Sequence, residues 1–323
     1  MDTAVTDLPL NARALAIADE GVARAAELRV RAVTLRNGTR VIDAGVETAG
    51  GLDAGLLLAH MCLGGLGRVD LIPWVAGDVR WHGVQVRTDF PAAACMAAQY
   101  AGWAISTGDF FAMGSGPLRA RARVEKDLFA KLPFRDEASA GVLILEGRTL
   151  PPEPVADWIA GKAGIDPARL TLAIAPTASL AGGVQVVARV VETGLHKMDT
   201  LGFDITRVVN ATGTAPIPPV ARNDLRAIGR TNDCVLYGGH AIYTVHASED
   251  ELEALAERLP SAASSDYGTP FYDTFKRYGN DFYRIDPLLF SPASVSLTSV
   301  ETGRTFNTGS INLEVLRASL MGS

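Results

Sequence analysis

The chain has 323 residues, of which 48% are hydrophobic and 20% charged, so it can bury a large core and lacks the composition of a disordered protein. Its net charge of −6 argues against a general nucleic-acid-binding surface, and its three cysteines, with no close pair among them, exclude a disulfide framework and a Cys-rich zinc site. No basic segment leads into an apolar core at the start and no run of about 18 uncharged apolar residues occurs, so we expect a cytoplasmic protein without a membrane span.

The first half of the chain predicts a mixture of helices and strands. A long amphipathic helix is expected over residues 11–33, followed by a hairpin whose turn is Asn37-Gly38. Further helices are expected at 51–67, which ends in glycines, and at 91–105, which is rich in alanine. Strands are expected at 68–74, 82–90 and 139–147.

The length of the chain predicts roughly two domains. A proline-rich stretch at 149–155 is the clearest break between them. We therefore place domains at 1–150 and 151–323. This boundary is approximate, and the domains would be discontinuous if a terminal segment crossed back into the first domain. After the break, helices are expected at 155–164, 184–198 and 248–260, and strands at 169–176, 234–247, 282–290, 293–303 and 304–314. Ser248 and Glu251 form a capping box. Without strict alternation of strand and helix, the pattern predicts an α/β fold with mixed or antiparallel sheets.

Common catalytic motifs are missing from the sequence. No G-x-S-x-G elbow, H-E-x-x-H pair or P-loop occurs. Gly65 and Gly67 could begin a dinucleotide fingerprint, but a helix rather than a strand precedes them, which favours plain turns. The sequence therefore contains no standard motif for a zinc site, a nucleotide phosphate or a dinucleotide cofactor.

The most informative segment is the predicted helix at 184–198. At about 100° per residue, its core-facing residues gather within an arc of roughly 100°, and they are Val184, Val187, Ala188, Val191 and Leu195. Four side chains that form hydrogen bonds gather in a second arc of about 60°, and they are Gln185, Arg189, Glu192 and His196. Ordinary surface helices scatter their charges more widely, so this narrow polar line is a candidate site.

Arg189 and Glu192 also have a simpler interpretation as a surface ion pair three residues apart, which adds at most a few tenths of a kcal/mol. The better order for helix stabilisation puts the acid first, and here the order is reversed, which weakens that interpretation. His196 could pair with Glu192 around a metal, but the helix C-terminus or a core hydrogen bond is the simpler partner.

Polar residues near two turns are candidate substrate-binding residues. Thr177 and Ser179 precede the polar helix, where their hydroxyls would either cap it or meet a ligand, and Gln185 belongs to its polar line. A second set is expected in a loop just before a strand, where binding residues often lie, although turn chemistry is an alternative. It comprises Arg230, Thr231, Asn232 and Asp233.

Six segments, in order along the chain, together resemble methenyltetrahydromethanopterin cyclohydrolase. They are CLGGLG (62–67), QYAGW (99–103), FFAMGSGP (110–117), the stretch 175–198, GRTNDCVLYGG (229–239) and NDFYRIDPLLFSPA (280–293). Each is weak alone, but six in register are specific. Small departures are Gly183, where the family more often has Ser, and Cys234, where a small apolar residue is usual.

The resemblance implies two α/β domains with the pterin in the cleft between them, a homotrimer, and a role in one-carbon metabolism. It also implies a catalytic pair of Arg and Glu three residues apart, which matches Arg189 and Glu192. The substrate would be the 5,10-methenyl cation of tetrahydromethanopterin and the product its N5-formyl derivative. Because the bridging carbon is already cationic, the resemblance implies no metal and no cofactor, and Glu192 would only need to take a proton from water and return one to N10. Arg189 would keep that carboxylate ionised.

Two other functions remain open from the sequence. A metal-dependent hydrolase using Glu192 and His196 would contain bound metal and lose activity with a chelator. A pterin-binding paralogue without catalysis would keep the substrate site, although a pure binding protein has no need of a proton-transfer carboxylate.

Overall fold

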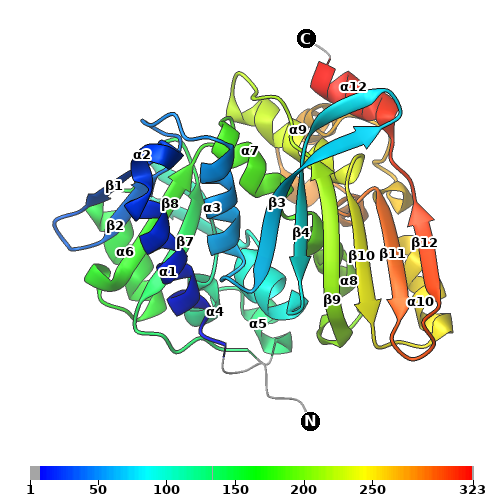
Figure 1. Ribbon diagram of the computed structural model, residues 1–323, viewed down its shortest axis with the longest axis horizontal. Coiled ribbons are helices and arrows are strands. Elements are labelled where there is room, and N and C mark those ends of the chain that lie inside the picture. Colours follow the sequence, from blue (N-terminus) through cyan, green and yellow to red (C-terminus); the bar gives the residue numbers. More distant parts are fainter. Residues whose placement is uncertain (1–7, 133, 322–323) are drawn as a thin grey trace. The chain divides into compact units, whose positions relative to one another are not determined.

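The computed structural model describes residues 8–132 and 134–321, whose helices and strands are drawn in Figure 1. The chain divides into two compact units, and each is built from two separate stretches. Unit 1 contains the described residues up to Gly67 together with Ala93–Gln185, and unit 2 contains Arg68–Ala92 and the described residues from Val186 onward. The predicted boundary at residue 150 does not coincide with this division.

Unit 1 is organised around a six-stranded sheet with the order β1-β2-β8-β7-β6-β5. β8 runs parallel to both β2 and β7, whereas the other pairs are antiparallel, so the predicted mixed sheet is confirmed. The strands are β1 (Arg31–Thr34), β2 (Arg40–Asp43), β5 (Trp103–Thr107), β6 (Phe110–Ser115), β7 (Gly141–Glu146) and β8 (Leu170–Ala175). Because β7 and β8 are neighbours in one sheet, unit 1 continues well past residue 150.

The two central strands of this sheet carry the core of unit 1. Val142 and Ile144 of β7 pack with α1 (Leu10–Ala23) and α3 (Leu52–Cys62), whereas Leu143 of the same strand packs with α6 (Glu153–Ala163). Successive side chains of a strand point to opposite faces. The continuous apolar runs of β7 and β8 are therefore typical of strands covered by helices on both sides, as Figure 1 shows.

The predicted hairpin forms, but the helix before it is shorter than expected. β1 and β2 pair with Val33 opposite Val41, and Gly38 in their turn has φ +87°, a left-handed conformation that favours glycine. The helix predicted over 11–33 ends with α2 (Ala25–Leu28), after which Arg29 has φ +55°. Residues from Arg31 onward belong to the strand, because pairing with β2 satisfies their backbone groups.

Three further helices are short: two belong to unit 1, and the third begins in unit 1 and ends in unit 2, which starts again at Val186. α4 (Leu118–Ala122) and α5 (Lys126–Lys131) follow the sheet strand β6, and α7 (Leu180–Val187) follows β8. The alanine-rich segment predicted as a helix over 91–105 forms a π-helix at Ala92–Gln99 and then enters β5. Its helical part is therefore confirmed and its C-terminal part is wrong.

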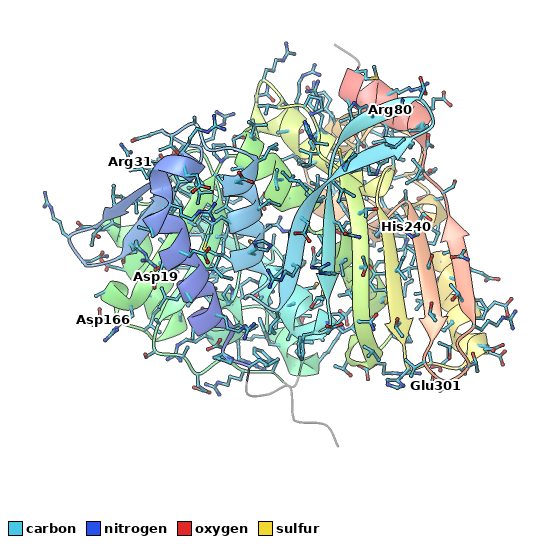
Figure 2. The ribbon with its side chains drawn as sticks, viewed as in Figure 1. Asp19, Arg31, Arg80, Asp166, His240 and Glu301 are labelled. Atoms are coloured by element: carbon cyan, nitrogen blue, oxygen red, sulfur yellow. The ribbon has the colours of Figure 1, made fainter. Side chains whose placement is uncertain are left out.

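Unit 2 is organised around a second six-stranded sheet, with the order β12-β11-β10-β9-β4-β3. β10 and β11 are parallel, whereas β9 is antiparallel to both β10 and β4. The strands are β3 (Gly67–Ala76), β4 (Val79–Thr88), β9 (Val208–Pro216), β10 (His240–Val245), β11 (Ser294–Ser299) and β12 (Thr305–Gly309). Figure 2 labels His240 at the start of β10 and Glu301 just after β11. This sheet is also mixed.

Helices cover one face of the unit 2 sheet. α8 (Val190–Thr200) packs on β9 and β10, and α10 (Glu249–Arg258) packs on β11 and β12; both lie behind the strands in Figure 1. α9 (Asp224–Leu236) packs against α11 (Phe271–Arg277) and α12 (Leu313–Met321). The predicted capping box is confirmed at the start of α10.

Three C-terminal segments differ from the prediction. The strand expected at 304–314 is limited to Thr305–Gly309, and α12 begins at Leu313. Residues 234–236 continue α9, and β10 begins only at His240, so the strand expected from 234 is shorter. The segment expected as a strand at 282–290 instead contains two 3-10 turns, Phe282–Arg284 and Pro287–Leu289. Asp286 accepts a hydrogen bond of 3.0 Å from the Leu288 N–H, and this local bond, with the proline between them, favours a turn over a strand.

Candidate functional site

The segment predicted as one polar helix is two helices. α7 ends at Val187 and α8 begins at Val190, with Arg189 immediately before it. The Arg189 N–H donates to the Val186 carbonyl at 3.1 Å, a tighter turn than that of an α-helix, and the Arg189 carbonyl accepts from the Thr193 N–H at 2.8 Å. The run of valines here has low helix propensity, which is consistent with a break.

The core-facing side of this segment is as predicted. Every predicted core residue is fully buried, and they are Val184, Val187, Ala188, Val191 and Leu195. The break therefore changes the path of the backbone without turning the apolar residues toward solvent.

Arg189 and Glu192 are both buried, at 8% and 5% exposure, so the interpretation as a surface ion pair is wrong. Glu192 lies in the first turn of α8. Because the N-terminal end of a helix carries partial positive charge, it favours a carboxylate there. The reversed order of base and acid thus has a local explanation, since the break in the helix gives Glu192 an N-terminal position that a continuous helix would lack.

α8 is anchored to the rest of unit 2 through its own backbone and through Lys197. The hydroxyl of Tyr243 on β10 donates a hydrogen bond of 2.8 Å to the carbonyl of Val191. The Lys197 ammonium donates to the carbonyls of Pro260, at 2.8 Å, and Leu288. The pKa of Lys197 is lowered from 10.5 to about 7, mainly because burial disfavours the charged ammonium.

Sequence reasoning missed Lys197 as a buried residue, although a signal was present. Val190, Gly194, Lys197 and Met198 recur at helical spacing, and all four are buried. A lysine that interrupts such an apolar stripe is expected to find polar partners inside the protein.

The predicted substrate-binding residues Thr177, Ser179 and Gln185 lie in unit 1. Ser179 caps α7, because its hydroxyl accepts from the Gly182 N–H at 3.0 Å, so the predicted capping role is confirmed. Thr177 is buried in the turn after β8. Gln185 is buried on α7, with its Oε1 4.0 Å from the Cys62 sulfur. Substrate contact by these three residues stays a prediction.

The second predicted set lies on α9, so its interpretation as a loop is wrong. Thr231 and Asn232 donate to carbonyls one turn earlier in the same helix, Ala227 at 2.9 Å and Ile228 at 2.8 Å. Arg230 donates to the Pro219 carbonyl at 3.3 Å. The helix begins beyond Asn223, whose side chain accepts from the Arg226 N–H and caps it.

Asp233, the last member of that set, is fully buried and joins three helices of unit 2. Its carboxylate accepts from the Phe271 N–H of α11 at 2.8 Å and from the Ser319 hydroxyl of α12 at 2.5 Å. Burial raises the pKa of Asp233 from 3.8 to about 7, while these two hydrogen bonds oppose the rise. The structure gives Asp233 a packing role that sequence reasoning missed, and substrate contact by the set stays a prediction.

His196, the residue proposed with Glu192 as a metal pair, is half-buried on α8. Among residues 8–132 and 134–321, no group of three or more His, Cys, Asp or Glu side chains is placed to hold a metal ion. No helix within the same ranges is long and apolar enough to cross a membrane.

Comparison with known proteins gives one consistent result. Residues 9–320 match the family described as Cyclohydrolase (MCH). The chain is 47% identical over 283 residues to the methenyltetrahydromethanopterin cyclohydrolase of Xanthobacter autotrophicus, covering 87% of this chain and 83% of that protein. It is 46% identical over 288 residues to that of Rhodopirellula baltica (87% and 86% covered) and 40% identical over 313 residues to that of Methanococcoides burtonii (97% and 98% covered).

Proposed function

Because the chain belongs to the Cyclohydrolase (MCH) family, we propose that it hydrolyses 5,10-methenyltetrahydromethanopterin to the N5-formyl compound in one-carbon metabolism. The observation that carries this proposal is the match to the family over residues 9–320. The sequence identity of 40–47% to three cyclohydrolases, over most of each chain, supports the same substrate class. The enzyme is therefore a hydrolase acting on a cyclic C–N bond.

The chemistry of the substrate sets what the protein has to supply. The bridging carbon belongs to an amidinium cation, so it is electrophilic before it binds. Water must lose a proton as it attacks, and N10 must gain one as the ring opens. A single carboxylate performs both steps in turn, for roughly 10²–10⁴-fold in rate, and no further cofactor is needed in this scheme.

Glu192 is the carboxylate that we assign to this role. It is the first acidic residue of α8, in a helical turn whose partial positive charge favours an anion. Its negative charge also favours the cationic substrate over the neutral product. At 5% exposure, the carboxylate lies in an environment where charge interactions are stronger than in water.

Arg189 is the partner that we assign to Glu192. Its guanidinium charge favours the ionised carboxylate and would donate a hydrogen bond to the developing formyl oxygen. Support comes from its burial, since a buried arginine one helical turn before a buried glutamate is not a surface ion pair. We also assign seven residues to substrate binding, some of them indirectly because they hold a helix in place. They are Thr177, Ser179, Gln185, Arg230, Thr231, Asn232 and Asp233.

The assembly and location follow from the same family resemblance. We propose a cytoplasmic homotrimer that has the tetrahydromethanopterin coenzyme as its small-molecule partner. Light scattering of the purified protein should then give about three times the 34.1 kDa of one chain.

A spectrophotometric assay of the purified protein tests the function. Addition of enzyme should speed the loss of the methenyl chromophore of methenyltetrahydromethanopterin, and methenyltetrahydrofolate should react far more slowly. Turnover lost with a chelator and restored by metal would instead favour the hydrolase that uses Glu192 and His196. Tight binding of the substrate without turnover would favour a pterin-binding paralogue.

A further inference from the structure

The first turn of α8 lies on a part of the unit 2 sheet that is made of small residues. On β9, Ala211, Gly213 and Ala215 are buried at alternate positions and so share one face. A Cβ atom added at Gly213 would lie 2.9 Å from side-chain atoms of both Val190 and Val191. The small residues therefore allow the beginning of α8 to lie close to the strand.

One large side chain, that of Tyr243 on β10, reaches from the same sheet to the backbone of α8. Tyr243 lies opposite Ala211 in the strand register and is fully buried. Its hydroxyl donates a hydrogen bond of 2.8 Å to the carbonyl of Val191, the residue before Glu192. A carbonyl in a helix has a second lone pair, so this bond adds to the helical one.

Gly194 makes this contact sterically possible. A Cβ atom at position 194 would lie 2.0 Å from the Tyr243 hydroxyl oxygen and 2.9 Å from its Cζ. Glycine is otherwise unfavourable inside a helix, and alanine would stabilise it. The close approach of Tyr243 is a physical reason for the glycine.

We propose that Tyr243 is a positioning residue for the hydrolysis, and that it acts by fixing the peptide between Val191 and Glu192. This inference rests on the role assigned to Glu192. The Tyr243 bond and the bond from Thr193 to Arg189 both restrain the turn that carries the two proposed catalytic residues. A displacement of about 1 Å at a reacting group is enough to cost roughly 10²-fold in rate, so loss of one restraint should affect turnover more than substrate binding.

Tyr243→Phe removes only the hydroxyl. We expect kcat to fall about tenfold while KM changes less than about twofold. The matched control is Tyr237→Phe, because Tyr237 is also fully buried in unit 2 and donates to a carbonyl at 2.8 Å, that of Thr269, which is not part of α8. This control should keep kcat within about twofold of wild type.

The pairing with Gly194 gives a rescue test. Gly194→Ala should lower both kcat and the melting temperature, although alanine favours the helix. The double variant Gly194→Ala/Tyr243→Phe should recover part of the melting temperature, since its nearest clash is with a ring carbon at 2.9 Å instead of the oxygen at 2.0 Å. Gly161→Ala on α6, whose added Cβ meets nothing within 4 Å, is the control for alanine in a helix without a clash.

The deciding measurement is kcat for Tyr243→Phe in wild-type and Glu192→Gln backgrounds. If Tyr243 acts through Glu192, its substitution should leave the residual kcat of Glu192→Gln unchanged. An equal fold-loss in both backgrounds, or a wild-type kcat for Tyr243→Phe, would overturn the positioning role alone. A wild-type kcat for Glu192→Gln would overturn the proposed base itself, which is a separate and distinguishable result.

Discussion

Arg189 is the residue immediately before α8, and Glu192 lies three residues later within the first turn of that helix. Both side chains are buried, and the backbone at Arg189 makes the break between α7 and α8. The relative position of the two residues is therefore set by the start of α8. They do not lie on the surface of one continuous helix. A helix start favours the negative charge of Glu192 and leaves Arg189 outside the helical repeat.

Substitution of Arg189 should change how activity depends on pH. With Arg189→Ala, protonation of the general base becomes easier, so the acid limb of the kcat/KM profile should move to higher pH. We also expect kcat to fall roughly 10²-fold from the loss of a hydrogen bond to the developing oxygen. Steady-state rates across the pH range measure both effects, and an acid limb that stays in place would remove Arg189 from this role.

Asp233 should make the protein less stable as the pH rises from about 4 to 7. Burial raises its pKa in the folded state to about 7, so in this window the folded protein holds a proton that the unfolded chain releases. The free energy of unfolding must then fall with increasing pH, by at most about 4 kcal/mol for this group.

Asp233→Asn should flatten that fall, because the amide oxygen still accepts one hydrogen bond and does not titrate. Urea unfolding at several pH values measures the slope. Asp109→Asn, at an exposed turn, is the control and should keep the wild-type slope. A variant at position 233 with the wild-type slope would show that Asp233 is ionised throughout this range.

Lys197 should have the opposite effect in a higher pH window. Its pKa is lowered to about 7, mainly by burial, while Asp286 opposes and Arg258 assists this change. Between about pH 7 and 10.5 the unfolded amine holds a proton that the folded one has released, so the free energy of unfolding rises with pH. After allowance for partial solvation, we expect a rise of about 2–4 kcal/mol.

Lys197→Met should remove this rise, and Lys126→Met, at an exposed position, should retain it. The measurement is again denaturant unfolding across the window. A rise of equal size in both variants would mean that other groups produce it.

Ser179 should contribute to stability through its cap on α7. Ser179→Ala leaves the Gly182 N–H without that acceptor and should cost about 1 kcal/mol, as Ser248→Ala should at the capping box of α10. If Ser179 also contacts the substrate, only Ser179→Ala should raise KM. If both variants lose the same stability and neither changes KM, Ser179 caps α7 and does not contact the substrate.

The features that could be predicted from the sequence depend on residues close to one another in the chain. The hairpin depends on Asn37-Gly38, and the helix start at Ser248 depends on Glu251 three residues later. A few neighbouring residues are therefore enough to predict each of them. The resemblance to the cyclohydrolase family predicts the enzyme class, which the match over residues 9–320 confirms, whereas the catalytic role of Arg189 and Glu192 stays a prediction.

Features that depend on distant partners could not be predicted in this way. Asp233 is buried on a helix because its carboxylate is satisfied by the Phe271 N–H and the Ser319 hydroxyl, 38 and 86 residues away. Its neighbours Thr231 and Asn232 come just before the strand predicted from residue 234, a position that favours a loop, but α9 continues to Leu236 and packs against α11 and α12. The same holds for Lys197, whose carbonyl partners lie in segments 63 and 91 residues further along.

The role of Glu192 is tested most directly by the single-turnover rate of Glu192→Gln with the methenyl substrate in the presence of saturating enzyme. Glutamine has nearly the same shape but cannot accept the proton from water, so the rate should fall roughly 10²–10⁴-fold while substrate affinity stays within about tenfold. A single-turnover rate close to that of the wild type would contradict the account, because another group would then have to move the proton.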